Sequence, residues 1–112
     1  AYYPPQAEAL KQLYDINMGI VGATMRPDRE AAEFHLPLAE DWTRRLQVGA
    51  YLRTGNIGQY KQMKARVYLE KLELLEHALD DDSDDDVRRH GREVDLAHRR
   101  LRVAFKAELK DG

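Results

Sequence analysis

Apolar side chains recur every three or four residues along most of the chain, a spacing typical of amphipathic α-helices. The first such segment is expected from about Pro5 to Ile20, followed by weakening at Gly19 and Gly22. Its stripe consists of Leu10, Leu13, Tyr14, Asn17 and Val21. No stretch alternates between apolar and polar residues for long enough to predict a β-strand. The pattern therefore predicts an all-α protein.

The second segment has a defined start and an internal proline. A proline and two acids in Arg26-Pro27-Asp28-Arg29-Glu30 stand where a helix start favours them. Pro37 lacks a backbone donor and disfavours helix at the preceding residue, so we expect either a kink or a new helix there, reaching Arg53. Gly55, in the connector Thr54-Gly55-Asn56, predicts a left-handed cap and a tight antiparallel hairpin.

The third segment, from Ile57 to Leu79, carries two adjoining apolar stripes. One consists of Ile57, Tyr60, Met63, Val67, Leu74 and Ala78, and the other of Tyr68, Leu72, Leu75 and Leu79. Because so broad an apolar surface usually packs against two neighbours, this helix is expected at the centre of the bundle.

A run of aspartates separates the last two helices. Because the six aspartates between Asp80 and Asp86 repel one another and cannot be buried, they predict an acidic linker over residues 80–86 that also caps the last helix. That helix is expected from Val87 to about Leu109. Its seam has the alternating spacing of a coiled coil and should pack within its own bundle: Val87, Gly91, Val94, His98, Leu101, Phe105 and Leu109.

The length of 112 residues is enough for one domain. We predict a single helical-bundle domain over residues 1–112, with up-and-down topology, three long helices and a shorter N-terminal one. Residues 1–5 would form an N-terminal arm that is either frayed or docked on a partner. The sequence shows no membrane-spanning apolar run, no signal-peptide pattern and no cysteine, so a cytoplasmic location is expected.

The net charge of −2 hides a strong segregation of charge along the chain. Residues 1–43 carry −4, residues 44–79 carry +4, the aspartate run carries −6 and residues 87–112 carry +4. Six cations of the last helix fall within one arc that only Asp95 interrupts: Arg88, Arg92, Arg99, Arg102, Lys106 and Lys110. This basic stripe is the candidate interaction surface, because it can follow a phosphate backbone or an acidic groove. The alternative is a solvated helix face in which Asp95 neutralises Arg92 and Arg99.

Groups that carry out catalysis or bind metals are scarce in this sequence. The only serine, Ser83, has no base nearby, and the glycines form no phosphate-binding loop. A calcium loop beginning at Asp82 would need glycine where Val87 stands. No histidine has metal-ligand spacing, and His98 is expected to be a hydrogen-bonded core residue. We therefore assign no catalytic, cofactor-binding or metal-binding residue and no small-molecule substrate, and expect a non-enzymatic protein.

Part of the chain resembles the second and third helices of BAG domains, which are three-helix chaperone cofactors. The resemblance covers about a third of the chain, running from Tyr68-Leu69-Glu70-Lys71 through Leu75 to Asp80 and again at Asp86-Val87-Arg88. Those domains bind their chaperone through a helix-two acid and a helix-three arginine and glutamine. Arg92 corresponds to that arginine in the resemblance. However, no glutamine follows Gln62, and the apolar register shifts by one position after Gly91. We therefore assign the chain to no family.

Long apolar helices, segregated charge and missing reactive groups favour a protein-protein interaction or assembly subunit. We expect a protein partner or a homo-oligomer, in which the acidic N-terminal half of one copy meets the basic last helix of another. The alternative is a nucleic-acid-associated protein that uses the basic stripe, with Arg44, Arg45 and Arg53. The negative net charge and the aspartate run act against this alternative, because both repel phosphates.

Overall fold

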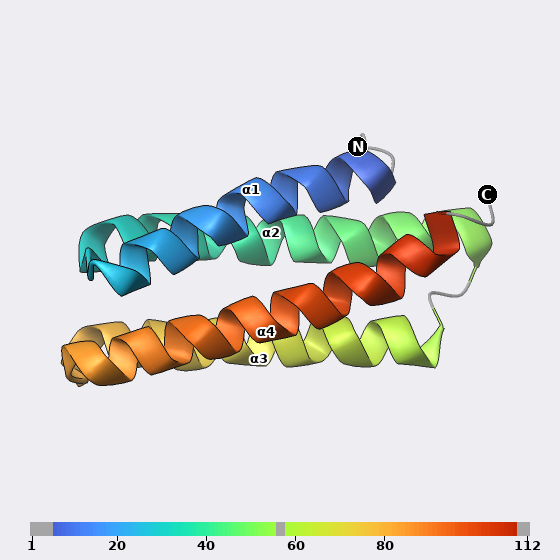
Figure 1. Ribbon diagram of the computed structural model, residues 1–112. Helices are drawn as coiled ribbons and strands as arrows, with labels where there is room; N and C mark the ends of the chain where they lie inside the picture. Colours follow the sequence, from blue (N-terminus) through green and yellow to red (C-terminus); the bar gives the residue numbers. More distant parts are fainter. Residues whose placement is uncertain (1–5, 56–57, 110–112) are drawn as a thin grey trace.

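The computed structural model describes residues 6–55 and 58–109, which form four helices: α1 (Gln6–Met25), α2 (Arg29–Thr54), α3 (Gln59–Asp81) and α4 (Asp84–Leu109). Consecutive helices run in opposite directions and pack as a bundle (Figure 1). Both α1 and α3 pack against α2 and α4. The α1/α4 side and the α2/α3 side are therefore opposite sides of the bundle. The predicted all-α helical bundle is confirmed.

The helices have 20, 26, 23 and 26 residues, so a division into three long helices and one short one is not confirmed. Across residues 6–55 and 58–109, none of the helices combines the length and the apolar character that a membrane span requires. The predicted N-terminal arm, Asn56, Ile57, Lys110 and the side chain of Leu109 lie outside the described part of the chain.

An aspartate and a glycine define the two ends of α2. The Asp28 carboxylate accepts a hydrogen bond from the Ala31 amide at 3.1 Å, as an N-cap does. Gly55 adopts a φ of 73°, and its amide donates to the Tyr51 carbonyl at 2.7 Å. A positive φ favours glycine, because a side chain would crowd the backbone. The predicted helix start and left-handed cap are confirmed.

Pro37 lies inside α2, which continues unbroken from Arg29 to Thr54. Of the two alternatives expected at Pro37, a kink and a new helix, the new helix is therefore ruled out. Pro37 and Glu33 are both exposed, so water is available to the Glu33 carbonyl that loses its backbone donor. On the opposite face, the buried side chains of Leu36 and Ala39 hold the helix against the core on both sides of the proline.

The two glycines near the end of the first segment do not stop α1, which reaches Met25. A Cβ atom built at Gly19 would lie 2.9 Å from Cδ2 of the His35 ring on α2. Glycine at this position therefore allows a close approach between α1 and α2. Their packing offsets the low helix propensity of glycine.

Most of the aspartate run is helical, so the linker predicted over residues 80–86 is wrong. α3 continues to Asp81 and α4 begins at Asp84, which leaves only Asp82 and Ser83 between them. The acids at the start of α4 stand where the helix dipole favours negative charge. The Ser83 hydroxyl accepts a hydrogen bond from the Asp86 amide at 3.3 Å, so the predicted capping role is confirmed.

Arg29, the first residue of α2, joins this turn to the rest of the bundle. Its guanidinium donates to the carbonyls of Leu79 and Asp82 at 2.9 and 2.7 Å and pairs with the Asp84 carboxylate at 2.9 Å. Arg29 thereby places a positive charge beside the carbonyls at the C-terminal end of α3 and beside one carboxylate of the aspartate run. This contact explains how helices can extend into a run of like charges.

The core contains the whole of one predicted stripe of α3 and only part of the other. The stripe of Tyr68, Leu72, Leu75 and Leu79 is buried. In the other stripe, Tyr60, Met63 and Leu74 are 57%, 50% and 43% exposed. The prediction that α3 occupies the centre of the bundle is wrong, because each of the four described helices packs against two others. Ala78 of that second stripe is buried and Val67 is partly buried, so its exposed surface consists of Tyr60, Met63 and Leu74.

The predicted seam of α4 is buried from Val87 to Phe105. Its glycine allows the close approach between α1 and α4, because a Cβ atom at Gly91 would lie 2.7 Å from the Cβ of Thr24 on α1. Thr24 is itself fully buried. The coiled-coil-like spacing therefore reports packing inside this bundle, as expected.

Candidate functional site

The predicted basic stripe lies on the side of α4 that is next to α1. The Nε of Arg88 donates to the Met25 carbonyl of α1 at 3.1 Å. The guanidinium of Arg102 lies 4.5 Å from the centroid of the Tyr14 ring, which also belongs to α1. The other described members of the stripe, Arg92, Arg99 and Lys106, are exposed. Lys110 lies outside the described residues.

The chain neutralises part of this stripe by itself. Arg99 pairs with Asp95 at 3.0 Å, and Arg88 pairs with Asp85 at 3.1 Å. Neither Arg92 nor Lys106 forms an ion pair with another residue in the described ranges. The expectation that Asp95 neutralises two arginines is therefore correct for Arg99 and wrong for Arg92.

A groove of about 520 Å³ runs between α1 and α4, beside the basic stripe. Its lining consists of Tyr14, Met18, Val21, Asp95, His98, Arg99, Arg102, Val103 and Lys106. Met18 and Val103 are 50% and 67% exposed, so apolar surface lies directly beside the cations. Sequence reasoning assigned Tyr14 and Val21 to a packing stripe and missed their part in the groove. The spacing of positions 14, 18 and 21 on one helix face was the available signal.

His98 contributes a buried base to the lining of this groove. Its side chain packs against the rings of Tyr14 and Tyr68, with centroids 6.1 and 5.8 Å away, and only 3% of the residue is exposed. Burial lowers the pKa of His98 to about 4, and Arg102 adds to this effect. The predicted core position is confirmed, but the expected hydrogen bond is missing at Nε2, which has no partner among the described residues.

A chain of polar contacts joins the core to the edge of the groove. The buried hydroxyl of Tyr68 donates to Asn17 at 2.9 Å, and the Asn17 amide donates to Asp95 at 3.3 Å. Asp95 in turn holds Arg99. Burial, reinforced by the negative charge of Asp95, raises the pKa of Tyr68 well above its usual range, so the hydroxyl keeps its proton. This network ties α1, α3 and α4 together and orients one cation of the basic stripe.

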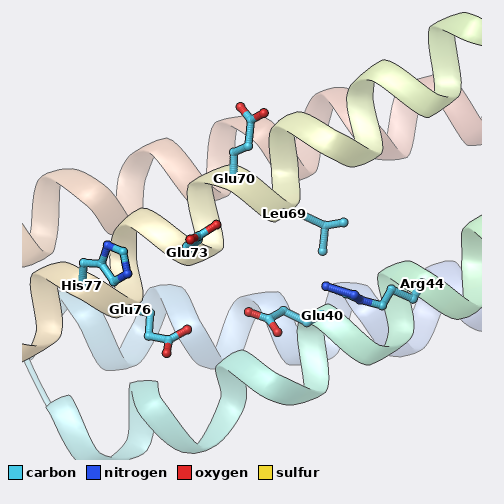
Figure 2. A pocket seen from close by; sticks show the side chains of 7 residues that line it. All are labelled: Glu40, Arg44, Leu69, Glu70, Glu73, Glu76 and His77. Atoms are coloured by element: carbon cyan, nitrogen blue, oxygen red, sulfur yellow. The ribbon is translucent and has the colours of Figure 1, made fainter.

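The opposite side of the bundle carries an acidic groove between α2 and α3. Two adjoining hollows of about 340 and 410 Å³ share Glu40 and Glu76 in their lining. Figure 2 shows Glu76 extending from α3 toward α2, where Glu40 and Arg44 extend toward α3. Six acids line the two hollows: Glu33, Glu40, Glu70, Glu73, Glu76 and Asp80.

Sequence reasoning missed this acidic groove for a specific reason. Residues 44–79 carry a net charge of +4, but Glu70, Glu73 and Glu76 are concentrated in the second half of α3. Folding places them opposite Glu33 and Glu40 of α2. Charge summed along the sequence therefore concealed a local excess of acid that only the pairing of α2 with α3 brings together.

Groups typical of metal sites and nucleophiles contribute little to the two grooves. Across the described residues, no group of three or more histidine, aspartate and glutamate side chains is placed to hold a metal ion. Ser83 is used as a helix cap. What the two grooves provide is charge of opposite sign on opposite sides of one bundle.

Comparison of the chain with family models, with curated proteins and with solved structures gave no match in any of the three. The class of protein is therefore defined by the fold and the surfaces alone. The chain is an all-α bundle with a basic, partly apolar groove on one side and an acidic groove on the other.

Proposed function

We propose that this chain is a non-enzymatic interaction or assembly subunit that binds an acidic, partly apolar protein surface through the α1/α4 groove. The observation that carries the proposal is the mixed lining of the groove. Arg99, Arg102 and Lys106 stand beside the exposed apolar side chains of Met18 and Val103. Protein interfaces combine an apolar centre with a polar rim, so this lining suits a protein partner whose acids meet the three cations.

The groove is built on helices that are held firmly together. Gly91 allows α4 to approach Thr24 of α1, and the hydrogen bond from Asn17 to Asp95 crosses between the same helices. A surface on packed helices keeps its shape better than one on a loop and therefore loses less entropy on binding. The contacts that fix α1 against α4 thus support a preformed docking surface.

Nucleic acid remains the second candidate, and the contacts of the stripe favour it less. Arg88 and Arg99 are paired with aspartates, and Arg102 lies over Tyr14. Nucleic-acid affinity grows with the number of cations that reach phosphates. Exposed apolar side chains in the same groove also add little to phosphate binding. The proposal of an interaction or assembly subunit includes the cytoplasmic location that the sequence leads us to expect.

The proposal is tested by fluorescence anisotropy with three labelled probes at about 50 and 200 mM salt. The probes are an amphipathic helical peptide with glutamates and leucines on opposite faces, the same peptide with lysines for the glutamates, and a DNA duplex. We expect the acidic peptide to bind more tightly than the other two and to weaken with salt. Tighter binding of the duplex would support the second candidate and overturn the proposal, as would equal binding of the two peptides.

A matched pair of variants locates the binding surface. Arg99→Gln with Lys106→Gln removes two cations of the groove and should weaken binding of the acidic peptide about tenfold or more. Arg26→Gln with Arg100→Gln removes two exposed cations that do not line the groove and should change the affinity by less than about twofold. Equal losses in both variants would show that peptide binding reflects net charge and not the groove.

A further inference from the structure

The two grooves lie on opposite sides of the same bundle and carry opposite charge. The α1/α4 groove is lined by Arg99, Arg102 and Lys106, and its one acid, Asp95, is already paired with Arg99. The α2/α3 side is lined by six acids, accompanied by Arg44 and His77. Both sides are formed by helices of 20 or more residues, which run along the 43 Å length of the bundle.

We propose that the partner of the α1/α4 groove is a second copy of this chain, which presents its acidic α2/α3 side. This inference rests on the proposed function and names the partner that it leaves open. The six acids of the α2/α3 side form no ion pair within the described residues, so their charge is available to an outside cation. Complementary charge of this kind speeds association and sets the register of the partners.

Apolar surface is present on both sides and would be buried by the same contact. Met18 and Val103 are exposed at the α1/α4 groove. On α3, helical spacing places the half-exposed Met63 and Leu74 on the same face as Glu70. Burial of such side chains supplies the non-directional part of the association energy, which charge alone does not provide at physiological salt. Met63 and Leu74, which belong to the α3 stripe that the sequence predicted to be apolar core, would thereby be buried by the second copy.

The dimensions of the bundle match this role. The bundle measures 43 by 25 by 19 Å between Cα extents, so each long side covers at least about 800 Å², comparable to what each partner buries in a stable interface. A stable contact must therefore cover most of a side, which includes the groove and the exposed residues on either end of it. A contact between two α1/α4 sides would instead bring like charges together.

The arrangement has a consequence for the size of the assembly. When the basic side of one copy covers the acidic side of the next, the outer sides of both copies remain free. Two copies cannot satisfy both sides, so the contact continues into a series or closes as a ring of more than two copies. A compact symmetric dimer is not expected.

The test is sedimentation velocity of the full chain between about 10 µM and 1 mM at low and high salt. We expect species larger than a dimer that grow with concentration at low salt and dissociate at high salt. A chain that stays monomeric at the highest concentration and low salt would overturn the proposal. A closed dimer at every concentration would overturn it as well.

Mixing two single-side variants sharpens the test. Arg99→Gln with Lys106→Gln impairs the basic side, and Glu73→Gln with Glu76→Gln impairs the acidic side. Each variant alone should be largely monomeric, whereas their mixture should form a 1:1 dimer and stop there, because one intact side of each kind remains. No dimer in the mixture would contradict the arrangement.

Matched controls keep the outcomes separate. Arg26→Gln with Arg100→Gln, and Glu8→Gln with Glu30→Gln, make the same charge changes at exposed residues that line neither groove. Both controls should assemble like the unaltered chain, and a loss of assembly equal to that of the groove variants would overturn the proposal. Binding of the acidic peptide by a strictly monomeric chain would disprove self-assembly and leave the proposed function standing. Absence of both would disprove the two together.

Discussion

The α1/α4 side and the α2/α3 side of this bundle are held together in different ways. Between α1 and α4, Gly91 lies against Thr24, and Asn17 donates a hydrogen bond to Asp95 in the middle of the helices. Between α2 and α3, Arg29 makes its contacts at one end of the helices, and farther along the helices the space is lined by acids. One side therefore combines direct bonds with a basic groove, whereas the other carries an excess of acids that form no ion pair within the described residues.

The difference shows that a stable bundle can carry charge it does not itself neutralise. Like charges across the α2/α3 side repel, and the other contacts of the four helices must offset this cost. The same acids suit a surface for a cationic partner. The predictions below disturb first the core that both sides share, then the α1/α4 side, and finally the balance of charge between the two.

The largest effect is expected from the shared core under the exposed stripe of α3. Leu72→Ala should lower the free energy of unfolding by about 2–5 kcal/mol, because Leu72 is fully buried and its truncation leaves a cavity. Leu74→Ala, two residues away on the exposed stripe, should change it by less than about 1 kcal/mol. Urea titrations of both variants measure the difference. Equal losses would mean that the second stripe is packed after all.

Acidification should weaken the α1/α4 side through His98. Its pKa is about 4 in the folded protein against an ordinary value of 6.5, so between these values the unfolded chain binds a proton that the folded chain does not. Stability from His98 is therefore complete above pH 6.5 and is lost as the pH falls toward 4. The total loss should be about 3 kcal/mol.

The contribution of His98 can be isolated between pH 5 and 6.5, above the ordinary range of most carboxylates. Asp95, Arg99 and Arg102 of α4 and the rings of Tyr14 and Tyr68 face the imidazole and stay in both chains of the comparison. Urea titrations should show a slope of up to about 1.4 kcal/mol per pH unit in the unaltered chain and little slope in His98→Gln. Equal slopes would contradict the proton assignment.

Gly91→Ala should separate α1 from α4. The added Cβ would lie 2.7 Å from the Cβ of Thr24, so the helices must move apart, at a cost of about 1–3 kcal/mol that exceeds the gain in helix propensity. Thr24→Ala in the same chain should recover part of the loss. Gly49→Ala is the matched control, because its Cβ would meet nothing within 4 Å, and it should be neutral or stabilising. Thermal unfolding of the three variants measures these changes in stability. A Gly91→Ala variant more stable than the unaltered chain would contradict the close contact between Gly91 and Thr24.

The sequence predicted some features of the fold and missed others. Local signals identified the all-α class, the left-handed cap at Gly55 and the buried seam of α4. They failed where tertiary contacts decide: helix α2 continues through Pro37 because both of its halves pack on the core.

The candidate site was predicted in part, for the same reason. The basic stripe follows from helical spacing on one element, and the structure places two of its members, Arg88 and Arg102, against α1. The acidic groove needs the pairing of Glu40 on α2 with Glu76 on α3, residues 36 positions apart in the chain. The contact of Gly91 with Thr24 likewise joins residues that are distant in the chain, so no local sequence pattern predicts it.

The smallest predicted effect compares the two sides directly, in chains kept dilute enough to be monomeric. Glu73→Gln with Glu76→Gln removes repulsion with Glu70 and Asp80 at helical spacing and should raise the free energy of unfolding by about 0.5–1 kcal/mol at low salt. Arg99→Gln with Lys106→Gln breaks the exposed pair with Asp95 and should lower it by about 0.3–0.5 kcal/mol.

Both changes should fade in about 1 M salt, because screening removes exposed charge interactions of either sign. Opposite signs at low salt would show that the acidic side lowers the stability of the single chain while the basic side does not. A loss of stability in both variants would mean that the acids of the α2/α3 side already have cationic partners within the chain. The side would then have no charge available for a second copy, and the comparison between the two sides would no longer support assembly.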